Sequence, residues 1–200
     1  TVPTGDSPLY EKPLELRQDA DFQAVAFRKG EPGEVYAEKI SFNKATARPV
    51  TLEKDPADSY KFGGASVLVD GLRGDTRFSS GRWLGFGNFT PMTAVVDLGE
   101  GTEFSSAGAG VCICTADGIF DARKMTISVS DDGGSFREIA EEEYPRLERE
   151  TKETTSHILT FEPVKARYVK VHLLPEREIP SWNWLAGGKA WLFVDEIIVR

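Results

Sequence analysis

The sequence has few of the residues that build disulfide scaffolds or metal clusters, since two cysteines and two histidines occur among 200 residues. Cys112 and Cys114 lie two positions apart in a pattern typical of a strand. Both side chains then leave the same face, which is an awkward geometry for a disulfide between them. A four-ligand zinc site would need further donors near this pair, and the neighbouring sequence has none. We expect two reduced core thiols, and the cysteine count neither supports nor excludes secretion.

The chain also lacks an excess of positive charge and a long apolar run. Its 24 Lys and Arg residues stand against 32 Asp and Glu residues, giving a formal net charge of -8 and a pI near 4.9. Nucleic acid needs a basic face, so no nucleic acid partner is expected and a neutral or cationic partner fits better. No apolar run approaches the ~20 residues of a membrane span, so we expect no membrane insertion.

Regular alternation of strand and helix patterns is missing as well, and short strands at regular spacing are present instead. Met125, Ile127 and Val129 alternate with polar residues, as in a half-buried strand. Residues 137–153 contain Pro145 and no apolar face, so a solvated strand and loop is favoured over a helix. The strand candidates after residue 60 are 66–69, 93–98, 108–114, 124–130, 155–161, 166–173 and 190–199. This pattern predicts an all-β antiparallel β-sandwich of the jelly-roll kind.

The N-terminal part is a thin sheet. Residues 21–28 and 34–42 are strand candidates joined by a Gly- and Pro-containing turn. So few strands would be marginal alone, and because the chain starts at Thr1 without Met, we expect the remnant of a small β-sandwich whose first strands lie upstream. The predicted organisation is therefore an N-terminal module over residues 1–46, a polar linker over 47–60 and a larger domain over 61–200.

Residues 70–89 form the most unusual stretch of the sequence. It holds five glycines, three arginines, two aspartates and four aromatic residues without helical or strand period. Glycines let backbone carbonyls approach a ligand, carboxylates suit a hard cation, and aromatic rings beside Arg and Asn suit a sugar. A loop of this length in a small domain is usually functional, so the stretch is a candidate site.

Five motifs in fixed order resemble a discoidin, or factor V/VIII C-type, domain of the kind classed as a family-32 carbohydrate-binding module. They are Leu68-Val69-Asp70-Gly71, Ser80-Gly81-Arg82-Trp83, the strand from Met125 to Ser130 with its Asp131-Asp132-Gly133 turn and Phe136, Ala166-Arg167-Tyr168-Val169-Lys170-Val171, and Phe193-Val194-Asp195-Glu196-Ile197. The resemblance covers about residues 50 to 200 and implies a galactose-binding-like jelly roll.

A second resemblance concerns the N-terminal part. Ser7-Pro8-Leu9-Tyr10, Ala24-Val25-Ala26-Phe27 and Gly33-Glu34-Val35 are similar to the end of the fibronectin-like module that follows the catalytic barrel in bacterial chitobiases and β-N-acetylhexosaminidases of glycoside hydrolase family 20. It implies a parent enzyme with an upstream catalytic domain, secreted, periplasmic or on the outer surface of a bacterium. No catalytic residue is expected in this chain. The resemblance implies that the catalytic barrel carries an adjacent Asp-Glu pair at the end of a strand. Asp195-Glu196 is such a pair, but it lies in the last strand, where successive side chains leave opposite faces, and the chain lacks the β/α repeats of a barrel.

The discoidin resemblance implies a structural calcium. Carried over by motif, its ligands would be Asp70, Ser80 and Glu196, with carbonyls near Leu68 and Arg73 and with the side chain of Asp75 as a further candidate. Calcium takes six to eight oxygens at ~2.3 to 2.6 Å, which a glycine-rich loop can present. The loop is longer than the compact family pattern, which leaves Asp75 and the carbonyls open. The alternative is an Asp-Gly turn in which Asp70 accepts backbone hydrogen bonds without any metal.

For sugar binding, the relevant surface of the family is one end of the jelly roll, and we expect aromatic faces to stack on a pyranose there. Trp83 and Trp191 are expected to be structural. The alternative is that the loop aromatics plug the end of the sandwich. The expected carbohydrate site is Trp182, Trp184 and Asn183 facing Arg77, Arg82, Phe86 and Asn88, with Phe120 as a weaker contributor.

Three functions follow from these patterns. The first is a non-catalytic carbohydrate-binding region that targets a β-N-acetylhexosaminidase to glycans with terminal galactose or N-acetylhexosamine. The second is a packing module that braces the catalytic domain, or contacts another protein, without binding sugar. Adhesion to lipid or cell surfaces is a third, which the net charge of -8 disfavours for anionic membranes.

Overall fold

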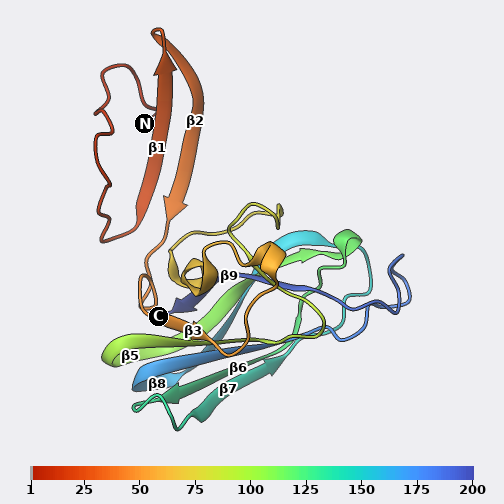
Figure 1. Cartoon of the computed structure of the whole chain (residues 1–200). Coiled ribbons are helices and arrows are strands. Elements are labelled where there is room, and N and C mark those ends of the chain that lie inside the picture. Colours follow the sequence, from red (N-terminus) through yellow and green to blue (C-terminus); the bar gives the residue numbers. More distant parts are fainter. Residues whose placement is uncertain (1) are drawn as a thin grey trace. The chain divides into compact units, whose positions relative to one another are not determined.

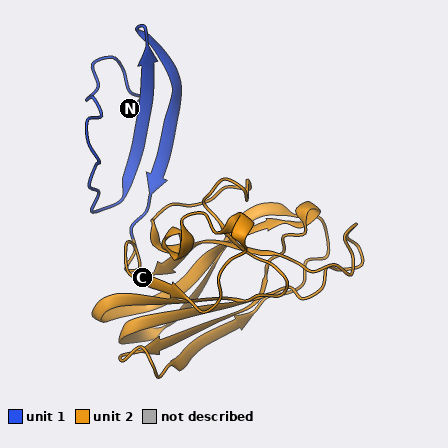
Figure 2. Ribbon diagram, viewed as in Figure 1, with its two compact units in different colours: residues 1–42 blue, residues 43–200 orange. Residues whose placement is uncertain are grey.

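The computed structural model describes residues 2–200, and the chain divides between Phe42 and Asn43 into two units (Figure 2). Unit 1 is residues 1–42 and unit 2 is residues 43–200. The predicted linker over residues 47–60 lies inside unit 2, where it forms the strand β3 (Val50–Leu52) and the 3-10 turn η1 (Asp58–Tyr60). Val50 and Leu52 pack on the main core, Pro56 is buried, and Tyr60 packs against Trp83 and Phe193, so this stretch is part of the domain and not a linker.

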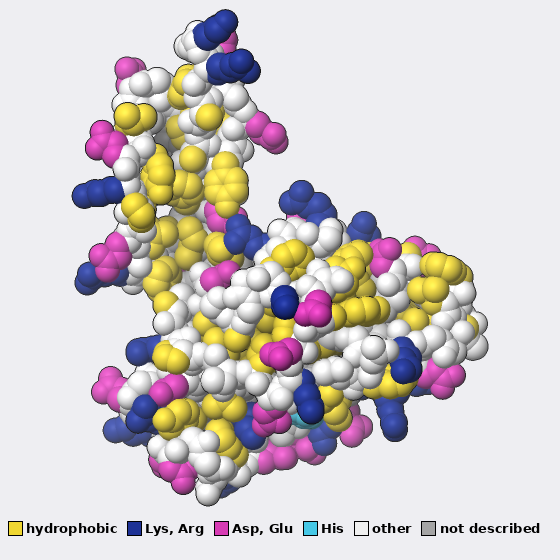
Figure 3. Space-filling model, viewed as in Figure 1, with side chains coloured by type: hydrophobic (Ala, Val, Ile, Leu, Met, Phe, Trp, Pro, Cys, Tyr) yellow, Lys and Arg dark blue, Asp and Glu magenta, His cyan; other side chains and the backbone are white. Residues whose placement is uncertain are grey.

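Unit 1 is a two-stranded antiparallel hairpin. β1 (Ala20–Arg28) pairs with β2 (Glu31–Ile40) across a turn at Lys29 and Gly30, which both have positive φ (Figure 1). Positive φ at both central residues is the geometry that matches strand twist in a tight hairpin. Phe22 and Tyr36 pack edge to face at 6.3 Å. No side chain of residues 2–42 is buried, and hydrophobic side chains lie open on the surface of the hairpin (Figure 3).

Unit 2 is an antiparallel β-sandwich, as predicted. Its further strands are β4 (Leu84–Phe86), β5 (Met92–Cys114), β6 (Ala122–Ser130), β7 (Arg137–Glu143), β8 (Lys152–Pro175) and β9 (Leu192–Val199). They pair in the order β4-β9-β5-β8-β6-β7, and β3 adds to β5 (Figure 1). The paired strands β5 and β8 shift register between Asp97 and Ser106, where the ladder turns from one layer into the other. The main hydrophobic core lies between the two layers.

Three predictions about strands differ from the structure. Residues 66–69 were expected to be a strand, but they belong to the 3-10 helix η2 (Gly64–Val69), which buries Val67, Leu68 and Val69. A short apolar run predicts burial but does not distinguish strand from helix. The strand candidates 93–98 and 108–114 are one strand, β5, and the candidates 155–161 and 166–173 are likewise one strand, β8. Among the described residues no helix has the length and apolar character that crossing a membrane requires.

Candidate functional site

The ends of six strands bring four loops together at one end of the sandwich. Phe86 pairs with Leu192, Met92 with Leu173, Cys114 with Lys152 and Ala122 with Pro175. The loops that join these strand ends therefore share one edge of the domain, which we call the loop end. It consists of residues 87–91, 115–121, 144–151 and 176–191.

Three consecutive residues fasten the longest of these loops to two others. Trp182 Nε1 donates to the carbonyl oxygen of Leu147 at 2.8 Å, Asn183 Nδ2 to that of Thr115 at 2.8 Å, and Trp184 Nε1 to that of Ala116 at 3.0 Å. Backbone bonds within residues 179–188 add to this anchoring. The loop is therefore held in one conformation by its own side chains.

The two indoles of this loop differ in exposure. Trp184 is 77% exposed, whereas Trp182 is 37% exposed and lies tilted against Phe120 with ring centroids 6.1 Å apart. An exposed aromatic ring that is fixed by a hydrogen bond loses little conformational entropy when a flat ligand stacks on it. Trp184 therefore offers a preformed stacking face, and Trp182 supports the loop beside it.

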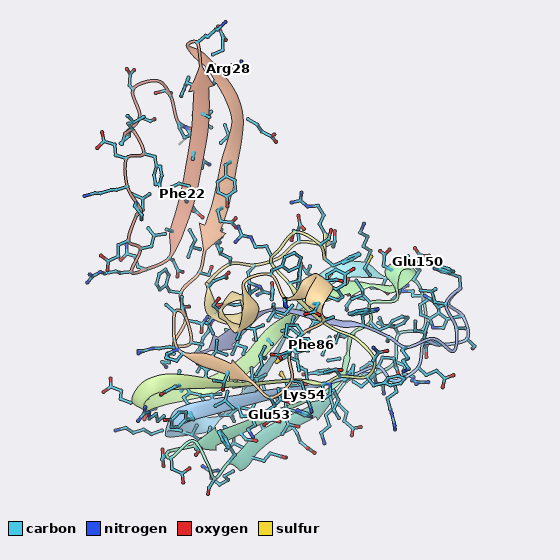
Figure 4. The ribbon with its side chains drawn as sticks, in the orientation of Figure 1. Phe22, Arg28, Glu53, Lys54, Phe86 and Glu150 are labelled. Atoms are coloured by element: carbon cyan, nitrogen blue, oxygen red, sulfur yellow. The ribbon has the colours of Figure 1, made fainter. Side chains whose placement is uncertain are left out.

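Three of the predicted sugar contacts are buried, which corrects their assignment. Asn183 is 6% exposed, and its oxygen accepts from the backbone of Leu185, so both ends of its amide are used inside the loop. Phe86 and Phe120 are 1% and 2% exposed. Phe86 lies among the interior side chains of unit 2, whereas Glu150 lies on the surface (Figure 4). These three residues shape the loop end but offer no surface to a ligand.

The predicted partners from residues 77–88 have different surroundings. Arg77 pairs with Asp75 at 2.8 Å in a turn of its own, and both side chains are exposed. Arg82 is half-buried, next to the buried ring of Trp83. Asn88 alone belongs to the loop end, where it is exposed. Of these three residues, Asn88 lies within the four loops of the loop end, and Arg77 and Arg82 lie outside them.

Sequence reasoning missed Phe89 and Lys189. Lys189 Nζ lies 5.4 Å from the centroid of the Phe89 ring, which is 38% exposed, and so links the loop 87–91 to the loop 176–191. Asn88 and Phe89 both have positive φ, at 56° and 62°. Two consecutive non-glycine residues in this region store backbone strain of the kind that gathers at functional sites. The only sequence signal was an Asn-Phe pair following Gly87 in the unusual loop.

The predicted metal ligands separate into two places. Glu196 is 2% exposed, and its two oxygens each accept from the backbone N–H of Gly71 at 3.2 Å, with Asn43 Nδ2 at 3.3 Å from Oε1. Burial, together with the nearby charge of Asp70, raises the pKa of Glu196 to about 9. Two carboxyl groups at this spot would share a proton or a cation more readily than they would both ionise.

Asp75 and Ser80 do not complete that set. Asp75 accepts from the backbone and the guanidinium of Arg77, and its carbonyl accepts from Trp83 Nε1 at 3.0 Å. Ser80 is exposed. Asp70 Oδ1 accepts from the backbone N–H of Leu72, which is the metal-free turn weighed as the alternative. Among residues 2–200 no group of three or more His, Cys, Asp or Glu side chains is arranged to hold a metal ion.

The sequence matches a known domain family and is similar to several solved structures. The family described as the F5/8 type C domain matches residues 53–186. No curated protein matches the chain. Similar solved structures include chitosan-binding module 1 of a chitosanase/glucanase from Paenibacillus sp. IK-5, at 18% identity and a TM-score of 0.49, covering 80% of this chain and 98% of that chain. A fucose-binding module from Streptococcus pneumoniae has 21% identity and a TM-score of 0.49, over 87% of this chain and 98% of its own.

A third similar structure is CpGH89CBM32-5 from Clostridium perfringens, in complex with GalNAc-beta-1,3-galactose. It has 18% identity and a TM-score of 0.49, covering 76% of this chain and 93% of that chain.

Proposed function

The chain belongs to the F5/8 type C domain family, and from that premise we propose that unit 2 is a non-catalytic carbohydrate-binding domain whose ligand lies on the loop end. The observation that carries the proposal is Trp184, whose indole is 77% exposed while its Nε1 is bonded to Ala116. A merely structural tryptophan would bury its ring. The exposed face is the surface that an apolar sugar face can cover.

Two polar side chains of the loop end suit hydroxyl-bearing ligands. Asn88 offers an amide donor and acceptor, and Lys189 offers an ammonium donor. A pyranose combines an apolar C–H face with a rim of hydroxyls, so one aromatic ring and a few polar groups can hold it. We propose glycans with terminal galactose or N-acetylhexosamine as the ligand class.

Titration calorimetry with galactose, N-acetylgalactosamine and N-acetylglucosamine, supported by a glycan array, tests the proposal. Trp184→Ala should weaken binding about tenfold, which corresponds to about 1.4 kcal/mol. Phe62→Ala is the matched control, because Phe62 is an aromatic residue that is 46% exposed and lies outside the loop end. No glycan binding by the wild type, or equal binding by Trp184→Ala, would refute the proposed function.

Calcium remains a proposal for the position between Asp70 and Glu196. These two carboxyl groups, together with backbone carbonyl oxygens of the surrounding loop, are the kind of oxygen ligands that a hard cation prefers. The raised pKa of Glu196, to about 9, supports the idea, because burial and the nearby charge of Asp70 both disfavour the bare carboxylate and a cation would offset both. Asp75 and Ser80 are not included in this proposal, because their contacts are made elsewhere in the loop.

For the parent protein we propose a bacterial β-N-acetylhexosaminidase that acts outside the cytoplasm. The support is the resemblance of the motifs in unit 1 to the module that follows the family-20 barrel. A binding domain tethered to such an enzyme would raise the effective concentration of substrate at the catalytic site. Sequencing the gene upstream of the Thr1 codon tests this, since a barrel with an adjacent Asp-Glu pair is expected there.

The second candidate, a bracing or protein-binding module, is supported by unit 1. Its exposed apolar side chains include Leu9, Tyr10 and Tyr36, and no side chain of residues 2–42 is buried. A two-stranded sheet without a core is marginally stable in water, so a covering protein surface would stabilise it. Hydrogen exchange of β1 and β2 within the longer parent protein distinguishes the cases, because strong protection there would support bracing.

A further inference from the structure

Glu176, the residue that follows β8, is a buried carboxylate shared by two arginines. It is 3% exposed. Oε1 lies 2.7 Å from Arg146 Nη2, Oε2 lies 3.3 Å from Arg123 Nη1, and the backbone N–H of Arg177 donates to Oε1 at 2.9 Å. A carboxylate that accepts several charge-assisted bonds holds its donors in defined positions. Glu176 therefore adds side-chain links from the end of β8 to β6, with which β8 already pairs, and to the segment that holds Arg146.

The two arginines come from different parts of the fold. Arg123 lies in β6, whereas Arg146 lies in the irregular segment between β7 and β8. We call residues 144–149 the strap. At its start, the backbone N–H of Tyr144 donates to the carbonyl of Arg123, and the ring of Tyr144 stacks on His157 at 3.8 Å. Beyond Tyr144, the strap is held by the ion pair of Arg146, by the packing of Leu147 and by the hydrogen bond that the Leu147 carbonyl accepts.

The strap carries the acceptor for Trp182. Leu147, next to Arg146 in sequence, accepts from Trp182 Nε1 through its carbonyl oxygen at 2.8 Å. The orientation of that carbonyl depends on the backbone of the strap, which the ion pair between Arg146 and Glu176 restrains. Trp184 has a separate acceptor, Ala116, in another loop. The two indoles therefore have different supports, and only that of Trp182 runs through Glu176.

We propose that Glu176 is a positioning residue of the loop end: it fixes the strap through Arg146 and thereby sets the orientation of Trp182. Its burial keeps it from touching a ligand, so it acts only through this chain of contacts. The effect on ligand affinity rests on the proposed carbohydrate-binding function. The effect on Trp182 does not.

The first test needs no ligand. Exchange of the indole N–H protons with solvent, followed by NMR, reports on Trp182 and Trp184 separately. Glu176→Gln should speed the exchange of the Trp182 indole about tenfold and leave that of Trp184 within about twofold, because only the first hydrogen bond loses its support. Glu178→Gln is the matched control, since Glu178 is an exposed glutamate of the same loop. An unchanged rate for Trp182 in Glu176→Gln would overturn the proposal.

A second variant keeps the proposal testable if Glu176→Gln does not fold. Arg146→Gln removes the same link from a side chain that is 55% exposed, and it leaves Glu176 paired with Arg123. It should also speed the exchange of the Trp182 indole. If Arg146→Gln folds and leaves the Trp182 rate unchanged, the strap does not act as proposed.

Binding then separates positioning from general destabilisation. Glu176→Gln should lower glycan affinity about fivefold in the wild-type background and not further in a Trp182→Phe background, because coupled residues are not additive. An equal loss of affinity in both backgrounds would overturn the positioning route. If the wild type binds no glycan, the proposed function fails, and the exchange measurement alone still decides the role of Glu176.

Discussion

Arg73 Nε lies 2.8 Å from Oδ2 of Asp195, although the two residues are 122 positions apart. Asp195 is fully buried, and its Oδ2 also accepts from the backbone N–H of Gly74. Its neighbour Glu196 accepts from Gly71 on the opposite face of β9. The segment 71–74 therefore bonds to side chains on both faces of β9. These bonds attach the loop of residues 70–89 to the sandwich.

Loss of Arg73 should destabilise the folded protein. Arg73→Met leaves the Asp195 carboxylate buried without its cation, which should lower the free energy of unfolding by about 3 kcal/mol. Arg77→Met is the control, because its pair with Asp75 is exposed and should contribute less than about 1 kcal/mol. Urea titration measures both. Equal effects of the two substitutions would contradict the importance of this buried pair.

Gly110 should not tolerate a side chain. A Cβ at this position would overlap Asp195 Oδ1 and Arg73 Nη2, which pack directly over the strand. Gly110→Ala should therefore lower the free energy of unfolding by at least about 3 kcal/mol, since neither member of the buried pair can move without losing the other. Gly134→Ala, where the nearest atom is 3.7 Å away, should change it little. Thermal melts in which both variants match the wild type would argue against the close packing.

Glu196 should make stability fall as pH rises. Its pKa is about 9 in the folded state against 4.5 for the free group, so the folded protein retains a proton that the unfolded chain releases. With EDTA present, the melting temperature should drop between about pH 5 and pH 9, by at least about 5 °C more than that of Glu196→Gln. Burial also raises the pKa of Asp195, against the opposing effect of Arg73, so the difference between wild type and variant is the relevant quantity.

Adding calcium to the same melting experiment tests the proposed ion site. If the ion binds between Asp70 and Glu196, it should raise the melting temperature of the wild type at pH 8 and leave Glu196→Gln unchanged. A calcium response that survives in Glu196→Gln would place the ion elsewhere.

The two thiols should be unreactive in the folded protein. Burial raises the pKa of Cys112 to about 12 and that of Cys114 to about 11, and the thiolate is the reactive form. With a chromogenic disulfide reagent at pH 8, neither thiol should react within minutes in buffer, and both should react in denaturant. Rapid labelling of the native protein would show that the long loop opens readily from β5.

Phe86 shows why the sequence did not predict the whole site. Flanked by Gly85 and Gly87, it resembles a loop aromatic, yet Leu84–Phe86 pairs with β9 and turns the ring into the core. Side chains at either glycine would overlap the rings of Phe193 or Trp191. These glycines therefore serve ring packing and not loop freedom, and this becomes visible only when distant residues are placed.

The all-β class, the strand around Met125, Ile127 and Val129, the reduced cysteines and the family motifs follow from the sequence by itself, because period, residue type and order are local properties. Tertiary structure alone decided which aromatic residues face solvent. Trp184 is exposed whereas Phe86 and Phe120 are buried, and Asp195 and Glu196 have separate partners. Exposure and pairing depend on segments that are far apart in the chain.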